Sequence, residues 1–262
     1  MAKKTALIVY NPLNEEAIKA SQRAQIYLER QNIRVIRQLH KKSKIDFAVS
    51  LGGDGTALWT AKILAQLGFE APVLAVNFGS VGALCTAQKN QLLKALDCAA
   101  KGKYTTDRRL RIEMTVMRKG KAILSAHALN EFAFNRRKER AVAIEVTDND
   151  IPLNLPKGDG LIVATYTGSK AYALSAGGKM IRRKDGLAAI VICPAGGVGG
   201  SALIDGSHKI IFMAPRGNVL AIEVDGHQVK GLKLNPDDTV VIRKSKVSTI
   251  FMKVKPENQI SG

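Results

Sequence analysis

The stretch Leu51-Gly52-Gly53-Asp54-Gly55-Thr56 joins an apolar run at residues 45–49 to a helical pattern at residues 57–67. Three glycines in a strand-to-helix turn allow positive φ angles and a close approach of the backbone to a ligand. The helix that follows points its free N–H groups and the positive end of its dipole at that ligand. Asp54 is the one ionisable side chain in the turn, so the pattern predicts phosphoryl chemistry with Asp54 as proton acceptor or metal partner. The alternative is an ordinary tight turn in which Asp54 caps the helix.

Apolar runs of strand length alternate with helical patterns through the first hundred residues. We expect strands at residues 5–10, 33–36, 45–50 and 72–77, and helices at residues 14–30, 57–67 and 88–100. This alternation predicts a parallel sheet with helices on both faces, in which ligands bind beyond the carboxyl ends of the strands. A second loop, Asn77-Phe78-Gly79-Ser80, leaves the fourth strand at the same edge as the glycine turn. Two loops at one edge favour a binding site there.

The pattern changes near residue 102 to alternation of apolar and polar residues, which is typical of antiparallel strands. Arg118-Lys119-Gly120 and Asp148-Asn149-Asp150 are turn sequences that predict hairpins, and residues 122–134 predict one long strand. We therefore expect an α/β domain at residues 1–102, a mostly β domain at residues 103–255 and a disordered tail at residues 256–262.

The chain is strongly basic, with 40 Lys and Arg against 22 Asp and Glu in 262 residues, a net charge of +18. Such a field attracts polyanions, including nucleotides, polyphosphate and nucleic acid. Aromatic residues make up only 5% and do not interleave with the basic clusters as a stacking surface for bases requires. We therefore do not expect nucleic acid as a partner.

The cysteine pattern and the hydropathy of the sequence indicate the cellular location. Cys85, Cys98 and Cys193 show neither a disulfide framework nor metal-ligand spacing, which fits a reducing compartment. No apolar run approaches the roughly 18 residues of a membrane helix, and the first residues carry no signal-peptide pattern. We expect a cytoplasmic protein with no membrane association.

A second group of polar residues follows a strand-like run, in the stretch Thr165-Tyr166-Thr167-Gly168-Ser169-Lys170-Ala171-Tyr172. Thr167, Ser169 and the N–H groups near Gly168 are candidates to hold an anion or ribose hydroxyls, and Tyr172 is a candidate to pack on a base. The alternative is a capped helix with Ser169 as the N-cap and Gly177 as the C′ residue.

Taken together, the motifs resemble those of the NAD kinase family. They are, in chain order, GGDGT at residues 52–56, Asn130-Glu131, Gly158-Asp159-Gly160, the element at residues 165–178 and Val224-Asp225-Gly226. Diacylglycerol and sphingosine kinases share the GGDGT element, and phosphofructokinases share it more distantly. The TGSxAYxxSAGG element is much more specific to NAD kinases.

The resemblance implies a Rossmann-like α/β domain followed by a mostly antiparallel β-sandwich domain, with the site between them, in homodimers or homotetramers. It implies transfer of the γ-phosphoryl group of ATP, or of polyphosphate, to the 2′-hydroxyl of the adenosine ribose of NAD, which gives NADP. Mg²⁺ or another divalent metal is implied as a cofactor, bound through the nucleotide phosphates without a protein metal site. The sequence leaves open ATP or polyphosphate as donor and NAD or NADH as acceptor.

The resemblance also implies roles for individual residues. Asp54 is the catalytic residue beside the acceptor hydroxyl, and Gly52, Gly53, Gly55 and Thr56 bind the phosphates. The implied NAD-binding residues are Asn130, Glu131, Asp159, Lys170, Ala171, Tyr172, Ser175 and Asp225. Among these, Asp159 occupies a position that meets the nicotinamide end across a subunit boundary.

The chain departs from the family pattern at several positions. Lys170 stands where the family usually has Thr, Tyr166 stands where it has Pro, and Ala83 ends the loop after the fourth strand in place of Phe. A glycine-rich loop at residues 195–201 lacks the arginine that usually follows Cys-Pro.

Two other readings remain at this point. A diacylglycerol-type lipid kinase shares the GGDGT element and an Asn-Pro pair near the first strand, here Asn11-Pro12, but leaves residues 167–178 unexplained. A catalytically weak nucleotide-binding protein of the same fold has no evident need of Asp54 among phosphates.

Overall fold

The computed structural model describes residues 3–80, 82–137, 140–197 and 200–254. The chain divides into two compact units: unit 1 comprises Met1–Arg109 and Val247–Gly262, and unit 2 comprises Leu110–Lys246. The expected boundary was wrong in one respect, because β6 (Thr105–Arg109) and β19 (Thr249–Lys253) pair with each other in the sheet of unit 1. Alternating hydrophobicity identifies a strand but does not say which sheet it joins. The tail at residues 256–262, expected to be disordered, lies outside the described residues.

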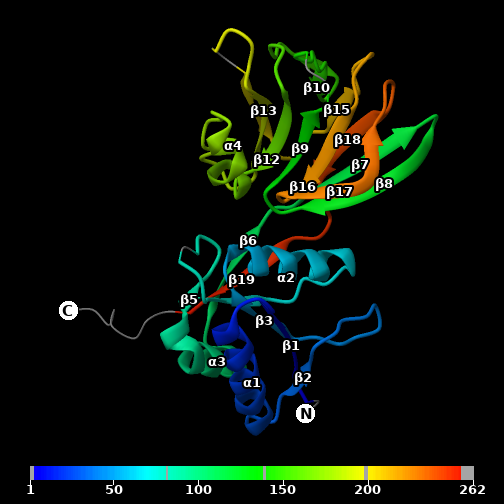
Figure 1. Ribbon diagram of the computed structural model, residues 1–262. Coiled ribbons are helices and arrows are strands. Elements are labelled where there is room, and N and C mark those ends of the chain that lie inside the picture. The colour runs from blue at the N-terminus through cyan, green and yellow to red at the C-terminus, as the bar shows by residue number, and fades with distance from the viewer. Residues whose placement is uncertain (1–2, 81, 138–139, 198–199, 255–262) are drawn as a thin grey trace. The chain divides into compact units, whose positions relative to one another are not determined.

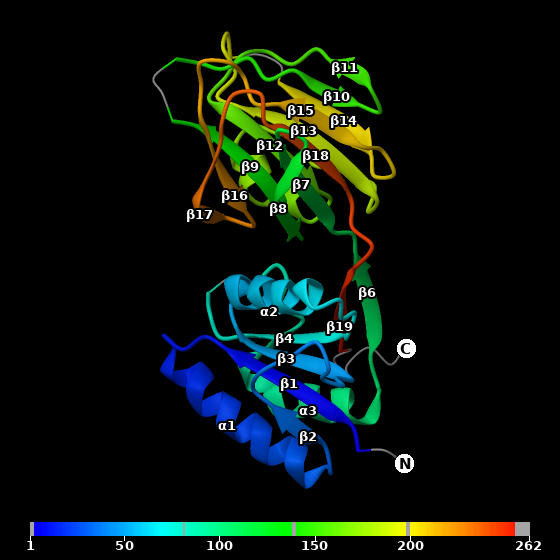
Figure 2. The ribbon, with the colours of Figure 1, turned by 90° about the vertical axis from the view of Figure 1, so that its right-hand side faces the viewer.

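Unit 1 is an α/β unit built on a seven-stranded sheet in the order β2-β1-β3-β4-β19-β6, with β5 beside β4. The pairs along this path are parallel except β19 with β6. Helices α1 and α3 cover one face of the sheet and α2 covers the other (Figures 1 and 2). The remaining elements are β1 (Thr5–Tyr10), α1 (Glu15–Arg30), β2 (Arg34–Ile36), β3 (Phe47–Gly52), α2 (Asp54–Gln66), β4 (Val73–Asn77), β5 (Ala87–Gln88), η1 (Lys89–Gln91) and α3 (Leu92–Lys101). The predicted α/β class is confirmed.

The ends of the helices in unit 1 follow from local chemistry. Asn14 caps α1, because its Oδ1 accepts a hydrogen bond from the N–H of Ala17 at 2.9 Å, and Glu15 and Glu16 occupy the first turn. Helix α3 ends at Gly102, whose φ of 71° is the left-handed conformation that glycine adopts without strain.

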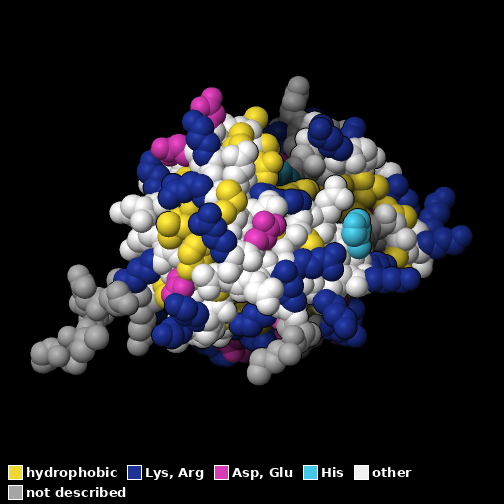
Figure 3. Space-filling view, turned by 90° about the horizontal axis from the view of Figure 1, so that it is seen from below, with side chains coloured by type: hydrophobic (Ala, Val, Ile, Leu, Met, Phe, Trp, Pro, Cys, Tyr) yellow, Lys and Arg dark blue, Asp and Glu magenta, His cyan; other side chains and the backbone are white. Residues whose placement is uncertain are grey.

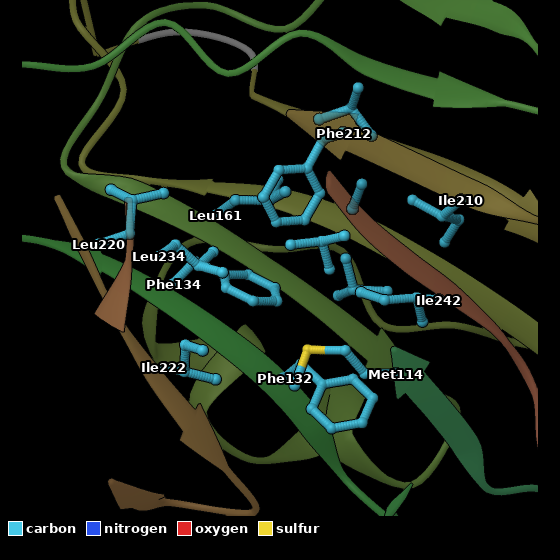
Figure 4. Packing of buried hydrophobic residues seen from close by; sticks show 14 of the residues in the cluster. Met114, Phe132, Phe134, Leu161, Ile210, Phe212, Leu220, Ile222, Leu234 and Ile242 are labelled. Atoms are coloured by element: carbon cyan, nitrogen blue, oxygen red, sulfur yellow. The ribbon is translucent and has the colours of Figure 1, made fainter. Parts of the chain in front are cut away.

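Unit 2 consists of two six-stranded sheets in the orders β11-β10-β15-β18-β7-β8 and β14-β13-β12-β9-β16-β17, with every pair antiparallel. Apolar side chains from both sheets form one core, in which the rings of Phe134 and Phe212 meet edge to face at 4.8 Å (Figure 4). The strands are β7 (Ile112–Arg118), β8 (Lys121–Ala128), β9 (Glu131–Arg136), β10 (Val146–Asp148), β11 (Ile151–Leu153), β12 (Gly160–Thr165), β13 (Gly186–Ile192), β14 (Ser201–Asp205), β15 (Ile210–Met213), β16 (Leu220–Val224), β17 (His227–Leu234) and β18 (Thr239–Lys244). The predicted sandwich is confirmed.

Both predicted hairpin turns are present in unit 2. Lys119 and Gly120 join β7 to β8 with φ angles of 50° and 76°, and Asn149 and Asp150 join β10 to β11 with 46° and 68°. Two successive positive φ angles are typical of the type I′ turn, whose twist matches that of the flanking strands. The expectation of one long strand at residues 122–134 was wrong, since β8 ends at Ala128 and β9 begins at Glu131.

A short helical segment covers the outer face of the second sheet. It comprises η2 (Gly168–Lys170) and α4 (Tyr172–Ser175), and Ala173 packs on Ile162 and Ile190 of the strands beneath. No helix among the described residues is both long and apolar enough to cross a bilayer.

Candidate active site

The glycine turn of unit 1 connects β3 to α2 at the carboxyl edge of the sheet. Gly53 is the N-cap of α2 and has no side chain to cap it. A Cβ on Gly53 or Gly55 would meet no atom within 4 Å, whereas a Cβ on Gly52 would collide with the side chain of Thr56. The turn therefore leaves a bare stretch of backbone at the start of α2, where the first N–H groups of a helix have no partners within it. Such a surface suits an anion.

Asp54, the first residue of α2, is held by the loop that follows β4. Its Oδ2 accepts a hydrogen bond from the N–H of Ala83 and its Oδ1 accepts one from the N–H of Leu84, both at 2.9 Å. These two bonds fix the plane of the carboxylate. Each oxygen keeps a further lone pair for a ligand.

The thiol of Cys85 lies against the same carboxylate. Burial, with the charge of Asp54 and a hydrogen bond to it, raises the pKa of Cys85 to about 12. The thiol also approaches the carbonyl oxygen of Gly52, with Sγ at 3.8 Å. Cys85 is therefore a neutral neighbour of Asp54 at physiological pH.

The second predicted loop meets the glycine turn as expected. Gly52 and Asn77 are paired residues of adjacent parallel strands, and the N–H of Phe78 donates to the carbonyl oxygen of Gly52 at 2.9 Å. Asn77 is buried, and its Oδ1 accepts from the N–H of Gly79 at 2.9 Å. The loops after β3 and β4 thus form one structure at the carboxyl edge. Of this loop, Val81 lies outside the described residues.

In unit 2, Asn130 and Glu131 lie where β8 gives way to β9. The carboxylate of Asp225 accepts hydrogen bonds from the N–H groups of Leu129 at 3.0 Å, Asn130 at 2.7 Å and Glu131 at 3.3 Å. Thr165 holds the other side, because its Oγ1 donates to the carbonyl oxygen of Leu129 at 2.6 Å. The Asn-Glu pair is therefore positioned by two segments distant in sequence.

The side chain of Glu131 is almost completely buried, with 3% of its surface exposed. Among the described residues its Oε2 has no hydrogen-bond partner. Burial, together with the charges of Asp225 and Glu223, raises the pKa of Glu131 to about 8. A buried carboxyl oxygen without a partner is costly in a free-standing fold, which points to a ligand group that completes it.

Tyr172 lies on the same side of the second sheet as Glu131. Its pKa is raised by burial and by the charges of Glu223, Cys193 and Glu131, so the phenol stands near these groups. Ala171 and Tyr172 are partly exposed and Ser175 is exposed. Tyr172 and Glu131 therefore lie near each other in unit 2.

The anion-binding expectation was wrong for the N–H groups of Thr167 and Gly168 and for the hydroxyl of Ser169. The N–H groups of Thr167 and Gly168 donate to Oγ1 of Thr165 at 3.1 and 3.2 Å. Ser169 is no N-cap either, because its buried hydroxyl donates to the carbonyl oxygen of Tyr166 and accepts from the N–H of Ile181. These groups fasten the segment to the sheet.

Gly168 and Gly177 each occupy a position that requires glycine, for different reasons. A Cβ on Gly168 would collide with the carbonyl group of Asn130, so this glycine permits a close approach to the Asn-Glu pair. Gly177 follows α4 with a φ of 83°, which confirms it as the C′ residue.

Lys170 is exposed and points to a different part of unit 2. Its Nζ lies 5.1 Å from the ring centroid of Tyr166, a cation–π contact. Both residues line a cavity of about 990 Å³, whose exposed apolar side chains include Leu174, Met180 and Leu203. Neither Asn130 nor Glu131 lines this cavity.

Asp159 is paired within unit 2. Its Oδ1 accepts from Nε of Arg136 at 2.7 Å, and both side chains are partly exposed. Asp159 precedes β12, and its N–H donates to the carbonyl oxygen of Ile192. The ion pair joins the start of β12 to the end of β9, and the backbone bond joins it to the end of β13.

Within the part of the chain that the structure describes, no group of three or more His, Cys, Asp or Glu side chains is arranged to hold a metal ion. Lys and Arg side chains are spread over the face shown in Figure 3, interspersed with apolar and acidic ones. The geometry therefore offers a glycine turn with one carboxylate in unit 1 and a buried Asn-Glu pair in unit 2.

Sequence reasoning missed several residues of this arrangement. Ala83 and Leu84 act through backbone N–H groups, so their side chains carry no signal. Cys85, Arg111 and Glu223 belong to none of the recognised motifs, and only the fold brings them close to Asp54, Asp225 and Glu131, respectively.

Comparison with known proteins identifies the family. Residues 17–104 match the family described as "ATP-NAD kinase N-terminal domain" and residues 129–254 match "ATP-NAD kinase C-terminal domain". The NAD kinase of Caldanaerobacter subterraneus subsp. tengcongensis is 35% identical over 219 residues, covering 82% of this chain and 76% of that protein. The NAD kinase of Desulfatibacillum aliphaticivorans is 31% identical over 265 residues, covering 94% and 91%.

Solved structures agree with these matches. An NAD kinase from Archaeoglobus fulgidus in complex with ATP superposes with a TM-score of 0.75 at 27% identity, covering 95% of this chain and 93% of that one. Yeast NADH kinase complexed with NADH shares the fold, with a TM-score of 0.85 at 19% identity and coverage of 98% and 84%. On these matches, the chain belongs to the NAD kinase family.

Proposed function

We propose that the protein is an NAD kinase that transfers the γ-phosphoryl group of ATP to the 2′-hydroxyl of the adenosine ribose of NAD, giving NADP and ADP. The observation that carries the proposal is the Asp54 carboxylate, fixed by the N–H groups of Ala83 and Leu84 in a bare glycine turn. A carboxylate beside an anion-binding backbone is what phosphoryl transfer to a hydroxyl requires. Family membership supplies the acceptor and the donor.

The reaction replaces one phosphorus–oxygen bond by another. The ribose 2′-oxygen bonds to the γ-phosphorus, the bond from that phosphorus to the β–γ bridging oxygen breaks, and ADP leaves with the electron pair. The carboxylate of Asp54 accepts the proton of the hydroxyl. Because two N–H bonds hold the carboxylate, little reorganisation accompanies that transfer.

The start of α2 binds the phosphates of the donor. Gly53 and Gly55 bring bare backbone to the phosphate oxygens, and the positive end of the helix dipole favours their charge. Gly52 has a different role, because its lack of a Cβ makes room for the side chain of Thr56. The side chain of Thr56 fills the space beside Gly52 and so packs against the turn.

Unit 2 recognises the adenosine part of NAD through Asn130, Glu131 and Tyr172, with Ala171 and Ser175 beside them. Glu131 is the residue with the most specific chemistry. With a pKa of about 8 its carboxyl group is largely protonated at neutral pH, and a protonated carboxyl donates a hydrogen bond as well as accepting one. The partnerless Oε2 then meets a polar group of the nucleoside.

A divalent cation fits this donor set only as part of the nucleotide complex. The described residues provide no protein cage, and Asp54 is the single carboxylate of the turn. Mg²⁺ is commonly held in this way, by substrate phosphates, waters and one or two carboxylates. When bound, it supplies charge neutralisation on the transferred phosphoryl group, and Asp54 is the residue that would share it.

The proposal extends to assembly and location. We assign a homodimer or homotetramer in which Asp159, held by Arg136, faces the nicotinamide end of NAD bound to another subunit. The location proposed is the cytoplasm, where the three free thiols fit a reducing environment.

The lipid-kinase alternative loses its support. It rests on the GGDGT element and Asn11-Pro12, both in unit 1, whereas residues 129–254 match the C-terminal domain of NAD kinases. A nucleotide-binding protein without activity remains separable by assay.

The test incubates purified protein and Mg²⁺ with NAD or NADH, and with ATP or polyphosphate, and identifies the products by mass spectrometry. We expect NADP from NAD and ATP, and loss of product on addition of EDTA. A diacylglycerol emulsion replaces NAD in the control. No phosphorylated dinucleotide from any donor, by a protein that still binds NAD, would contradict the proposal.

A further inference from the structure

Asp225 stands in a strained position directly after β16. Its φ of 48° lies in the left-handed region, which costs energy for a residue with a Cβ although Asp and Asn tolerate it better than most. The residue is buried, with 6% of its surface exposed. A strained, buried carboxylate persists only where the surrounding structure uses it.

The use is visible in the hydrogen bonds. Both carboxylate oxygens are occupied, Oδ2 by the N–H of Leu129 and Oδ1 by the N–H groups of Asn130 and Glu131. The N–H of Asp225 in turn donates to the carbonyl oxygen of Glu131 at 3.0 Å. Three successive N–H groups that point at one carboxylate cannot belong to a strand, where successive N–H groups alternate in direction. These three hydrogen bonds to Asp225 therefore interrupt the strand between the end of β8 and the start of β9.

A buried cation offsets the charge of Asp225. Arg111 is 1% exposed, and its Nη2 donates to the carbonyl oxygen of His127 at 3.2 Å. Burial lowers the pKa of Arg111, while the charge of Asp225 raises it, so the two charges stabilise each other. The pKa of His127 is lowered by burial and by Arg111, which keeps the imidazole neutral.

We infer that Asp225 is a positioning residue, which sets the backbone of the Asn130-Glu131 pair from beneath and does not itself contact NAD. Its oxygens are directed at protein N–H groups and its charge is balanced by Arg111. The effect of Asp225 on NAD binding rests on the proposed NAD kinase function. Its role in setting the backbone of Asn130 and Glu131 does not.

The inference gives Asp225 a second, electrostatic effect. Glu131 faces two anions, Asp225 and Glu223, whose charges raise its pKa, and the phenol of Tyr172 lies nearby. Removing the charge of Asp225 therefore lowers the pKa of Glu131. This readout belongs to the positioning role and does not depend on turnover.

The test is Asp225→Asn, which keeps the size and the tolerance of positive φ. One of the two oxygens becomes an NH₂ group that faces an N–H donor, so the turn loses at least one of its bonds. We expect the KM for NAD to rise about 10- to 100-fold, as misplacement of binding groups by about 1 Å does, with a smaller change in the KM for ATP. Carbon-13 NMR of Glu131 should show a lower pKa.

Asp238→Asn is the matched control. Asp238 is equally buried, accepts from Arg118 at 2.7 and 2.8 Å and from the N–H of Asn235 at 2.7 Å, and has no contact with the Asn-Glu pair. We expect it to lower stability yet leave the KM for NAD and the Glu131 titration within about twofold and a few tenths of a pH unit of the wild type. An unchanged Glu131 titration in Asp225→Asn, or an equal effect of both variants, would overturn the inference.

Native-state hydrogen exchange on the wild type covers the case in which Asp225→Asn does not fold. The N–H groups of Leu129 and Asn130 should exchange far more slowly than those of Lys119 and Gly120 in the β7–β8 turn. Equal exchange would overturn the positioning role. Absence of NAD kinase activity in the wild type would contradict the proposed function alone, because the exchange and titration results stand without it.

Discussion

The N–H of Leu84 donates a 2.9 Å hydrogen bond to Oδ1 of Asp54, thirty residues earlier in the chain. With the parallel bond from Ala83, it makes the orientation of the carboxylate a property of the loop after β4. The proposed catalytic group and the glycine turn are thus held in one structure at the carboxyl edge of the sheet of unit 1.

Gly52→Ala tests the packing behind the turn. The new Cβ collides with the side chain of Thr56, so we expect a loss of about 1–3 kcal/mol in the free energy of unfolding. Gly55→Ala is the matched control, because its Cβ meets no atom within 4 Å and alanine favours the helix by about 0.5–1 kcal/mol. Urea denaturation of the two variants measures the difference.

The KM for ATP gives a second test of the Gly55→Ala variant. Gly55→Ala should raise the KM for ATP although it does not lower stability, since the added methyl group occupies the surface assigned to phosphates. If Gly55→Ala keeps the wild-type KM for ATP, that backbone does not approach the donor.

Cys85 should report on the charge of Asp54. At pH 8 a thiol with a pKa of about 12 is almost wholly protonated, so exposed Cys193 should react with iodoacetamide long before Cys85. In Asp54→Asn the anion beside Cys85 is gone, and its labelling should accelerate. Peptide mass spectrometry resolves the sites, and equal rates at Cys85 in both proteins would place the thiol away from Asp54.

The titration of Glu131 predicts a pH dependence of stability. The pKa is about 8 in the folded state against an ordinary 4.5, so the folded protein holds this proton more tightly than the unfolded chain. The stability contributed by the protonated group is fully present below pH 4.5 and is lost as the pH rises through about 8. Glu131→Gln removes this dependence.

Chemical denaturation between pH 5 and 9 gives the measurement. The difference in unfolding free energy between Glu131→Gln and the wild type should grow in favour of the variant as the pH rises. A constant difference would mean that Glu131 is ionised throughout.

Substitutions at Lys170 and Tyr172, two residues apart, test which of these side chains contacts NAD. Tyr172 stands near Glu131 and Glu223, so Tyr172→Ala should raise the KM for NAD several-fold. Lys170 is exposed over Tyr166 at the separate cavity, so Lys170→Thr should change that KM far less. A larger effect at Lys170 than at Tyr172 would show that the lysine reaches the dinucleotide.

Much of the fold follows from sequence patterns because it is local. The cap at Asn14, the glycine turn and both hairpin turns depend only on residues a few positions apart in the sequence. Each is present as expected. The break between β8 and β9 is different. Residues 122–134 read as one strand, since the group that interrupts them is Asp225, more than ninety residues later.

The same limit applies to the site. Asp54 and the Asn-Glu pair stand in recognisable motifs, whereas the N–H groups of Ala83 and Leu84 carry no side-chain signal. Thr167 and Ser169 were expected to bind an anion because hydroxyls beside glycine often do. Instead, the N–H of Thr167 donates to Oγ1 of nearby Thr165, and the Ser169 hydroxyl accepts from the N–H of Ile181, twelve residues later.

The most direct test of the central claim is the rate of NADP formation by Asp54→Asn beside the wild type, with ATP, NAD and Mg²⁺. The variant keeps the size of the side chain and loses its charge and its ability to accept a proton. We predict a fall in kcat of at least about 100-fold, with NAD binding by calorimetry close to the wild type. The melting temperature should fall modestly, because the new NH₂ group faces a backbone N–H and one hydrogen bond is lost. Turnover within a few-fold of the wild type would contradict the account, because Asp54 would then serve only to hold the loop after β4.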